Sequence, residues 1–355
     1  MPVRVKHKFH PLPTVRDLIK MYKIRAEKQL AQNFLLCTKT NRRIVNAAGK
    51  IKNNYIFEVG PGPGGITRAI LEKNVIGLTV VEKDKRFLPG LELIKDTAKH
   101  TEMEIFIGDI LSFNMNQRFP DELKEQWEDG LPKIKILGNL PFNISTGLIL
   151  KWLEDISNQN GAWSYGRVPL TLTFQKEVAQ RLAAPINSKF RSRLSVMSQY
   201  LCDVNHVYNI PAEKFRPKPE VDAGVVNFVP KVEPLIKQPY PLVEKVVRHV
   251  FHYRQKRCQK SISTLFPPDQ TVEYTQEMIR AAEIDDRARP FQLAIEQYAQ
   301  LCEKYSEICQ HDPLLRDYDY RSPSSAAMRR EFRHRKREEM LGVRDEQAST
   351  QEQHL

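Results

Sequence analysis

The sequence predicts an α/β fold, in which helices cover a mainly parallel sheet, followed by a smaller all-α domain. Three observations support this prediction. The 355 residues, of which 41% are hydrophobic, are enough for two domains with cores of their own. Between residues 31 and 232, short apolar runs alternate with stretches of helical periodicity. Four prolines from Pro230 to Pro241 then mark a break, after which the patterns are helical only.

The elements of the sheet domain follow one another along the chain. Helices are expected at 65–73, 85–99, 145–156, 175–183 and 191–201, and after the prolines at 241–260, 270–283 and 290–310. The last two strands are joined by a proline-rich connection without a helix, so we expect an antiparallel pair at the end of the sheet. The strand-like runs are, in chain order, Tyr55–Val59, Gly77–Val81, Ile105–Ile107, Ile134–Leu137, Thr171–Phe174, His206–Ile210 and Val225–Val229.

Residues 1–30 form a basic segment before the sheet domain. None of the first 16 residues is acidic, which is typical of a mitochondrial targeting segment. Thr14 and Asp17 have the spacing of a capping box that opens a helix over residues 15–31. An ordinary basic amphipathic helix explains the same pattern equally well.

Residues 321–355 form a charged tail after the helical domain of residues 233–320. Apolar periodicity fades in this tail, and residues 329–337 (RREFRHRKR) carry six lysines and arginines in nine positions. The pattern indicates either a mobile basic tail or a solvated helix.

An excess of basic side chains gives the chain a formal charge of +12 and a pI near 9.4. The charge favours an anionic partner, nucleic acid first, although a basic surface that serves only solubility has the same composition. No apolar run approaches the ~18–20 residues of a membrane-spanning helix, so we expect no membrane partner. The five cysteines and nine histidines form no CxxC, HxxxH or HExxH pattern, which predicts a reducing compartment and no metal site.

A glycine-rich loop follows the first strand of the sheet domain. Gly60, Gly62 and Gly65 match the G-x-G-x-x-G pattern of dinucleotide-binding loops. A pyrophosphate is held there by backbone N–H groups, however, and Pro61 and Pro63 remove two of these donors. S-adenosylmethionine carries no phosphate, so the loop favours this methyl donor over NAD as the cofactor.

Acidic side chains end three successive strands of the predicted sheet. Glu58 precedes the glycine loop, Glu82 ends the next strand, and Asp109 follows the third. Ligands of open α/β sheets bind at these carboxyl ends. Glu82 is placed to accept the ribose hydroxyls and Asp109 the adenine amine, while Ile110 packs on the adenine ring. Each acid alone is equally consistent with a helix N-cap, but together with the glycine loop they favour a methyl donor.

The fourth strand runs into Asn139, Leu140, Pro141 and Phe142, which we take as candidate catalytic residues. An adenine N6 amine is a poor nucleophile, because its lone pair is delocalised into the ring. If the Asn139 side chain and the Leu140 carbonyl accept its hydrogens, the nitrogen can become pyramidal and attack a methyl group. Pro141 stiffens the turn, and Phe142 offers a face for the base. A plain strand–turn–helix with a buried Phe142 is the alternative.

A second aromatic turn lies at residues 215–221 (FRPKPEV). Its two prolines fix an extended loop that would present Phe215 to the other face of a base. Enzymes that modify nucleobases hold the extruded base between apolar side chains. Phe215 therefore joins the candidate catalytic residues, although such a loop could be purely structural.

Over residues 25–310 the chain resembles the ribosomal RNA adenine dimethyltransferase family. The resemblance implies a Rossmann-like methyltransferase domain with a helical second domain, S-adenosylmethionine as cofactor, and N6,N6-dimethylation of adenosine in small-subunit ribosomal RNA. The matching motifs are Gln32-Asn33-Phe34-Leu35, EVGPGPGG at the glycine loop, Val81-Glu82-Lys83-Asp84, Gly108-Asp109-Ile110, Asn139-Leu140-Pro141-Phe142 and the FxPxPxV run that begins at Phe215.

The resemblance also implies site residues and a cellular setting. Cys37 stands where the family commonly has Asp, which weakens a helix cap, and Phe142 stands where many members have Tyr, so a hydroxyl is not essential there. Likeness to mitochondrial members implies the mitochondrial matrix, two adjacent adenosines in a 3′-terminal stem-loop, the assembling small ribosomal subunit and, as a further partner, the mitochondrial transcription machinery. The expected cofactor-binding residues are Gln32, Asn33, Leu35, Glu58, Gly60, Gly62, Glu82, Lys83, Asp109, Ile110 and Asn139.

Basic clusters outside the sheet are candidates for RNA binding, because Lys and Arg contact phosphates without reading sequence. Solvated helix faces are the alternative for either cluster. The expected RNA-binding residues are Lys189, Arg191 and Arg193 in one short stretch, and Arg254 and Arg257 in the first helix of the second domain, where Arg248, Lys256 and Lys260 also lie beside His249, His252 and Tyr253.

The functional hypothesis is an S-adenosylmethionine-dependent RNA adenine-N6 dimethyltransferase. A nucleic-acid-binding factor of mitochondrial transcription or ribosome assembly, in which catalysis is incidental, is the alternative from another class. An NAD-dependent oxidoreductase ranks third, because the sequence offers no hydride-transfer acid in a suitable motif.

Overall fold

The computed structural model describes residues 13–22, 33–98, 100–116, 118–335 and 337. These residues divide into two compact units. One unit holds the described residues up to Ala183 together with Leu201–Pro234. The other holds Ala184–Tyr200 and the described residues from Leu235 onward, so the segment 184–200 groups with the helical unit. None of the described helices is long and apolar enough to cross a membrane.

The first unit is built on a seven-stranded sheet of order β4-β3-β2-β5-β6-β9-β7. The first five strands of this order are parallel, whereas β9 pairs antiparallel with both β6 and β7, which confirms the antiparallel pair at the end of the sheet. The bounds are β2 Tyr55–Val59, β3 Gly77–Glu82, β4 Glu102–Ile107, β5 Ile134–Gly138, β6 Leu170–Gln175, β7 Cys202–Ile210 and β9 Ala223–Pro230.

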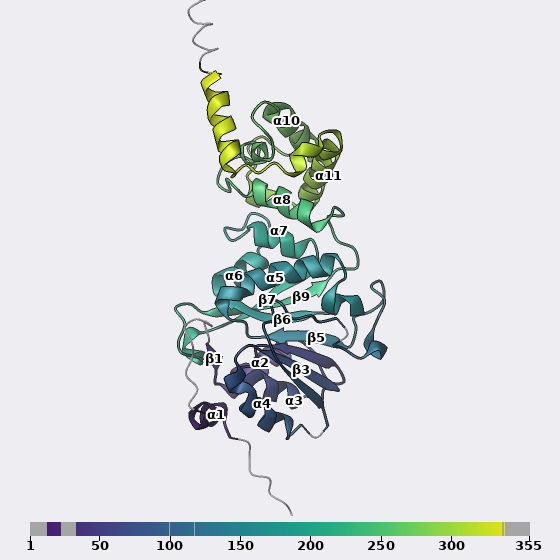
Figure 1. Cartoon of the computed structure of the whole chain (residues 1–355), viewed down its shortest axis with the longest axis vertical. Coiled ribbons are helices and arrows are strands. Elements are labelled where there is room, and N and C mark those ends of the chain that lie inside the picture. The colour runs from purple at the N-terminus through teal and green to yellow at the C-terminus, as the bar shows by residue number, and fades with distance from the viewer. Residues whose placement is uncertain (1–12, 23–32, 99, 117, 336, 338–355) are drawn as a thin grey trace, which may run out of the picture. The chain divides into compact units, whose positions relative to one another are not determined.

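Helices cover both faces of this sheet. Figure 1 shows α2, α3 and α4 on one face and α5 and α6 on the other. All five residues of β2 are buried, as expected for a central strand covered on both sides. The bounds are α2 Thr38–Ala47, α3 Gly65–Leu71, α4 Leu88–Lys95, α5 Phe142–Ser157 and α6 Lys176–Leu182.

The start of the chain differs in part from the sequence prediction. Thr14 and Asp17 form the predicted capping box, but α1 spans only Val15–Met21, and residues 23–31 of the expected helix lie outside the described residues.

Two helices of the sheet domain begin differently from a regular capped helix. The helix expected at 85–99 is a 3₁₀ turn, Lys85–Phe87, followed by α4, which has a proline in its first turn. At α2, Cys37 is the N-cap and makes no capping hydrogen bond through its side chain, as its substitution for Asp suggested.

Sequence patterns missed a short two-stranded sheet. Strand β1, Phe34–Leu35, pairs antiparallel with β8, Phe215–Arg216, from the loop that carries the second aromatic turn. Two residues form too short a strand for a periodic pattern, and the pairing joins segments about 180 positions apart. The pairing brings Leu35 opposite Phe215.

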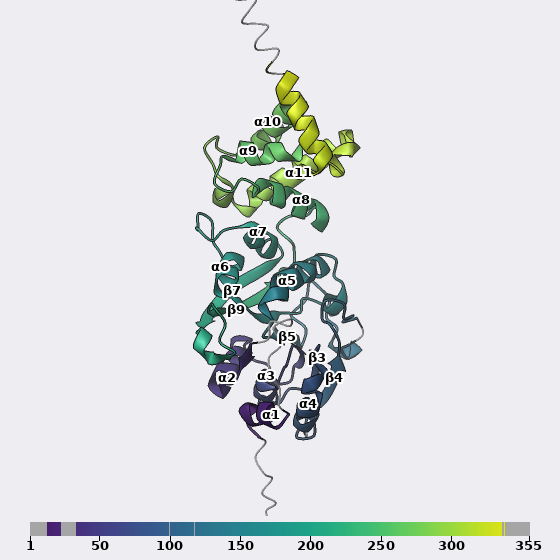
Figure 2. The same cartoon turned by 60° about the vertical axis from the view of Figure 1, so that its left-hand side comes forward.

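The second unit is all helical (Figure 2). The helix expected at 241–260 is two helices, because residues 251–257 form turns. Each longer helix buries one apolar face, such as Tyr298, Leu301, Tyr305 and Ile308 of the helix Ile295–His311. The bounds are α7 Arg193–Gln199, α8 Tyr240–Val250, α9 Cys258–Ile262, α10 Thr271–Ala281 and α11 Ile295–His311.

Candidate functional site

One cavity opens at the carboxyl ends of the parallel strands, where an open α/β sheet binds its ligand. Gln32 lies outside the described residues. Among the other predicted site residues of the first unit, only Glu58 does not line the cavity. Those that do are Asn33, Leu35, Gly60, Gly62, Glu82, Lys83, Asp109, Ile110, Asn139, Leu140, Pro141, Phe142 and Phe215.

The glycine loop forms the floor of the cavity because its backbone takes conformations that side chains disfavour. Gly60 and Gly62 have φ of 65° and 52°, and Gly64 at the N-cap of α3 has φ of 80°. Gly65 must lack a side chain for another reason, because a Cβ there would lie 2.6 Å from the Asn41 amide nitrogen. The loop therefore keeps backbone, and not side chains, against a ligand.

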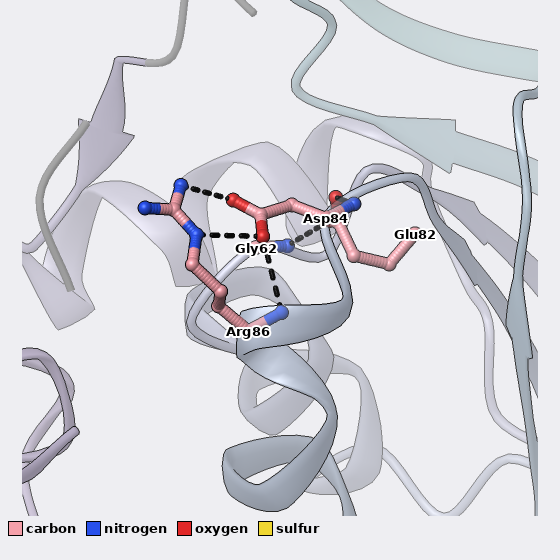
Figure 3. Close-up of polar contacts among 4 residues, drawn as sticks. All are labelled: Gly62, Glu82, Asp84 and Arg86. Atoms are coloured by element: carbon pink, nitrogen blue, oxygen red, sulfur yellow. Dashed lines mark hydrogen bonds and ion pairs between the residues drawn. The ribbon is translucent and has the colours of Figure 1, made fainter. Parts of the chain in front are cut away.

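Glu82 is the best-anchored acid of the cavity (Figure 3). One carboxylate oxygen accepts the Gly62 N–H at 2.9 Å, and the other accepts the Asp84 N–H at 2.8 Å. The neighbouring Asp84 is paired with Arg86 at 2.5 Å, which holds the turn after β3 (Figure 3). Burial nevertheless raises the pKa of Glu82. Each carboxylate oxygen has a second lone pair, so Glu82 can still accept two hydroxyl groups.

The position of Glu58 contradicts the prediction that this residue contacts the cofactor directly. Its side chain is 1% exposed, lies beside Thr67 of α3 and is absent from the cavity lining. Neither carboxylate oxygen accepts a hydrogen bond of normal geometry from the residues that the structure describes. Burial raises the pKa of Glu58 to about 8, so the carboxyl group is largely protonated at neutral pH. The strand-end position was read correctly, but the side chain points into the packed interior.

Asp109 and Lys83 form an ion pair at the mouth of the cavity, with 2.8 Å between Nζ and Oδ2. The other Asp109 oxygen accepts the Leu111 N–H at 3.0 Å. The bond from Lys83 is the main reason that the pKa of Asp109 is lowered, so this acid stays ionised. Beside it, Ile110 is 6% exposed and supplies an apolar wall.

Asn139 follows β5, and two neighbours fix its amide. Its Nδ2 donates to the Asn33 carbonyl at 3.3 Å, and its Oδ1 accepts the Thr173 hydroxyl at 2.8 Å. Leu140 is buried, and Phe142 begins α5 directly after Pro141. Thr173 lies in β6, fully buried, and was missed because its position reads as part of an apolar strand. The sequence signal that could have identified Thr173 is a hydroxyl side chain within an otherwise apolar strand, whose first five residues are buried in the structure.

Aromatic and amide side chains complete the cavity wall. Phe215 is 1% exposed and packs in the apolar core that also holds Phe34, so its buried ring contributes to the wall from β8. Phe34 meets Phe87 edge-on, with ring centroids 5.4 Å apart, and both line the cavity. Sequence reasoning also missed Asn41, which is 1% exposed. Its Nδ2 donates to the Leu35 carbonyl, while its Oδ1 has no donor among the described residues.

The cavity fits S-adenosylmethionine on two observations. The orphaned Asn41 Oδ1 is a buried acceptor in the wall, and an ammonium group of a ligand would satisfy it. The glycine backbone at φ above zero leaves room next to Glu82, whose free lone pairs suit ribose hydroxyls. No phosphate-binding cluster of cations accompanies Glu82 and Asp109 in the described lining, where Lys83 is already paired.

The predicted RNA-binding residues all fall in the second unit, and the structure corrects one of them. Arg191 is 1% exposed, and its guanidinium donates to the carbonyls of Ala184 at 3.2 Å and Leu293 at 3.1 Å. A guanidinium that is buried in this way cannot reach a phosphate. Arg191 joins two segments of the unit instead.

The other four predicted residues reach the surface to different degrees. Lys189 and Arg257 are exposed, whereas Arg193 and Arg254 are half-buried. Arg193 pairs with Glu244 at 3.1 Å, and Arg254 donates to the carbonyls of Arg191 and Lys189. Arg254 and Lys256 lie in the turn before α9 and not on a helix face. Of the five predicted residues, Lys189 and Arg257 are therefore the two that are exposed and whose ammonium or guanidinium group makes no hydrogen bond or ion pair within the described part of the chain.

Comparison with known proteins gives a consistent result. A family model described as ribosomal RNA adenine dimethylase matches residues 23–307. The chain is 52% identical over 311 residues to "Dimethyladenosine transferase 1, mitochondrial" of Homo sapiens, which covers 88% of this chain and 90% of that protein. It is 43% identical over 318 residues to the protein of the same name from Drosophila melanogaster, which covers 89% and 94%.

Solved structures resemble the fold at low sequence identity. A dimethyladenosine transferase from Plasmodium falciparum matches with a TM-score of 0.58 at 19% identity, over 75% of this chain and 95% of that one. The 23S rRNA methyltransferase ErmE matches with a TM-score of 0.54 at 22% identity, over 77% and 100%. These matches confirm the Rossmann-like methyltransferase fold with a helical second part.

Proposed function

Because the chain belongs to the ribosomal RNA adenine dimethylase family and is an rRNA adenine dimethyltransferase, we propose a specific reaction and setting for it. It transfers methyl groups from S-adenosylmethionine to the N6 amines of two adjacent adenosines in a 3′-terminal stem-loop of mitochondrial small-subunit ribosomal RNA. The setting is the mitochondrial matrix, where it acts on the assembling small subunit. The word mitochondrial in the names of relatives about 50% identical supports this location.

The first unit would hold the cofactor through residues at three strand ends. Glu82 accepts the ribose hydroxyls with the lone pairs that Gly62 and Asp84 leave free. Asp109 accepts the adenine amine while Lys83 keeps it ionised, and Ile110 packs on the ring. When bound, S-adenosylmethionine supplies an electrophilic methyl group. Asn41, which sequence reasoning did not select, accepts the ligand's ammonium group.

Asn139 and Leu140 would hold the target amine. The Asn139 Oδ1 and the Leu140 carbonyl accept the two N6 hydrogens, which favours a pyramidal nitrogen whose lone pair points at the methyl group. The Asn33 carbonyl can only accept, so it fixes the position of Nδ2, and the Thr173 hydroxyl then donates to Oδ1 and steadies the amide. Catalysis would then come from holding the amine in line with the methyl group. As the N–C bond forms, the methyl–sulfur bond would break, the thioether would leave and the N6 proton would pass to solvent, so no strong base is needed.

The observation that carries this proposal is that the doubly held Asn139 amide lines the same cavity as Glu82 and Asp109. Methyl donor and target amine can therefore meet at one place. Phe142 also lines this cavity, and its ring would stack on the target base.

The cellular test is primer extension across the 3′ end of the mitochondrial small-subunit ribosomal RNA in cells that lack the protein. We expect the two modification stops to disappear and to return with the wild-type chain but not with Asn139→Ala. Stops that persist without the protein would refute the proposed substrate.

Calorimetry separates the enzyme from the nucleic-acid-binding alternative. We expect the full chain to bind S-adenosylmethionine with one site, and Glu82→Ala to lose most of that affinity. A chain that binds RNA but gives no heat with S-adenosylmethionine would favour a transcription or assembly factor. Fractionation of mitochondria, followed by protease protection, tests the matrix location independently.

A further inference from the structure

The basic tail that the sequence left open between a mobile segment and a solvated helix begins as an ordered helix. Residues 323–335 are helical, shown in yellow at the end of the described chain in Figure 1. The Ser322 hydroxyl accepts the Ser325 N–H at 3.1 Å, and Pro323 takes the first helical position, so the start is a regular N-cap. The helix carries four arginines, Arg329, Arg330, Arg333 and Arg335.

Residues just before this helix contact the turn between α8 and α9. The hydroxyls of Tyr320 and Tyr253 share a hydrogen bond of 3.1 Å, and the rings of Tyr320 and His252 meet edge-on at 5.3 Å. The Arg321 Nη2 lies 3.2 Å from the His252 Nδ1. A guanidinium only donates, so this ring nitrogen accepts and His252 is neutral. Burial, Arg321 and Arg329 all lower the pKa of His252, in agreement with a neutral ring.

Aromatic rings also hold the cations of this region. The guanidinium carbon of Arg329 lies 3.8 Å from the centroid of the Tyr320 ring, and the ammonium of Lys260 lies 5.2 Å from that of Tyr253. We call these six residues the tail surface: His252, Tyr253, Lys260, Tyr320, Arg321 and Arg329.

The cations of the tail surface lack anionic partners. Within the described residues, no carboxylate pairs with Lys260, Arg321 or Arg329. The nearby Asp319 accepts the backbone N–H of Arg321 and not its guanidinium. Among the described residues, the Arg329 guanidinium has no acceptor for its Nη1. Lys260 and Arg321 are exposed and Arg329 is partly exposed, so a phosphate oxygen can approach these cations from solvent.

We propose that the tail surface binds the phosphate backbone of an RNA strand, with Tyr320 holding Arg329 in position. Stacked guanidinium groups are pre-organised for phosphate oxygens, since less side-chain freedom is lost on binding. RNA is the anion that the established activity brings to this protein. The inference rests on the proposed function for the choice of RNA, but its contacts lie entirely in the second unit and outside the methyltransferase cavity.

The test measures the affinity of the full chain for a fluorescein-labelled single-stranded RNA by anisotropy, at several salt concentrations. For single strands, log K falls with log salt by about 0.7 per phosphate contact. The double variant Arg321→Ala, Arg329→Ala should therefore lower the slope by about 1.4 and weaken binding several-fold. Arg330→Ala, which removes an equal charge from the next position of the same helix, should lose much less, because adjacent helical positions point in different directions.

A second pair of variants separates an organised surface from plain charge. Tyr320→Leu keeps every charge but removes the ring under Arg329, so we expect it to weaken RNA binding about as much as Arg329→Ala. Tyr320→Phe keeps the ring and should bind like the wild type. Circular dichroism of each variant checks that the helical unit is intact.

Three outcomes would overturn the inference. They are equal losses for Arg330→Ala and Arg329→Ala, wild-type affinity for Tyr320→Leu, and tighter binding of duplex DNA than of RNA. S-adenosylmethionine affinity, measured in parallel, should be unchanged in all variants. If the wild type binds RNA through this surface but methylates none, the proposed reaction fails while this inference stands.

Discussion

In each unit, one ionisable residue that sequence reasoning assigned to ligand binding is buried away from any ligand: Glu58 in the first unit and Arg191 in the second. Glu58 is buried in the first unit, and it tolerates burial because its carboxyl group is largely protonated. Arg191 is buried in the helical unit and keeps its place by donating to two carbonyls. A carboxyl group can lose its charge at modest cost, whereas a guanidinium cannot be deprotonated in a protein. Burial therefore has different consequences for the two residues. Glu58 becomes neutral, whereas Arg191 stays charged and needs hydrogen-bond acceptors.

The two units also differ in how well a sequence motif predicts which residues lie together: the strand-end motifs of the first unit do so better than the basic runs of the second. In the first unit the other described candidate site residues line one cavity, because parallel strands end at one edge of the sheet. In the second unit the predicted cations scatter between surface and interior. A run of Lys and Arg defines no geometry, so only packing decides which cations face solvent.

The largest expected effect concerns Glu58 and the pH. The folded chain holds a proton on Glu58 up to about pH 8, whereas an unfolded chain releases it near pH 4.5. Stability should therefore fall as the pH rises between these values, by up to about 1.4 kcal/mol per pH unit. Urea denaturation from pH 5.5 to 8 should show this slope for the wild type and a flatter one for Glu58→Gln. The exposed-site control Glu128→Gln should keep the wild-type slope; an unchanged slope in Glu58→Gln would mean that Glu58 is ionised when folded.

Asn139→Ala should affect turnover and leave cofactor binding nearly intact. Misplacing a reacting group by about 1 Å costs roughly 100-fold in rate, and we expect a loss of about that size in single-turnover methylation of an RNA fragment. Asn205→Ala, on the exposed edge strand β7, is the matched control. Full dimethylation by Asn139→Ala would remove this residue from the mechanism.

Arg191→Ala tests the other buried residue. It leaves the carbonyls of Ala184 and Leu293 without their donor, which should cost about 2 kcal/mol or more of stability by urea denaturation. S-adenosylmethionine affinity should not change. If instead the stability is kept and RNA affinity falls with a lower salt slope, Arg191 reaches phosphate after all and the structural role is wrong.

The smallest effect is expected at Thr173. Thr173→Val removes the hydroxyl that holds the Asn139 amide, and a hydrogen bond of this kind contributes about 1 kcal/mol, so turnover should fall roughly five- to tenfold. KM for RNA and affinity for the cofactor should be nearly unchanged, because Thr173 acts through Asn139. Thr173→Ser retains the hydroxyl and should restore turnover. An equal loss in the Ser and Val variants would point to packing and not to the hydrogen bond.

The sequence by itself determined most of the sheet domain and most of the residues that line its cavity. All seven strands of the main sheet lie where the apolar runs placed them, within a few residues, because strand periodicity and the glycine loop are local properties. Glu82, Asp109 and Asn139 were found for the same reason: each directly ends or follows a recognisable strand. The helix boundaries were less accurate at 85–99 and 241–260, since a turn inside a helical pattern leaves the periodicity almost unchanged.

Only the tertiary structure decided which distant residues meet. Pairing of β1 with β8, the Thr173 hydroxyl on Asn139, and Tyr320 against the α8–α9 turn each join segments that no local pattern relates. Burial of Glu58 and Arg191 was likewise decided by what packs over them. The physical reason is that composition and spacing report the chemistry of a side chain and its place along one element. Its surroundings depend on contacts between segments far apart in the chain, and those exist only once the core has formed.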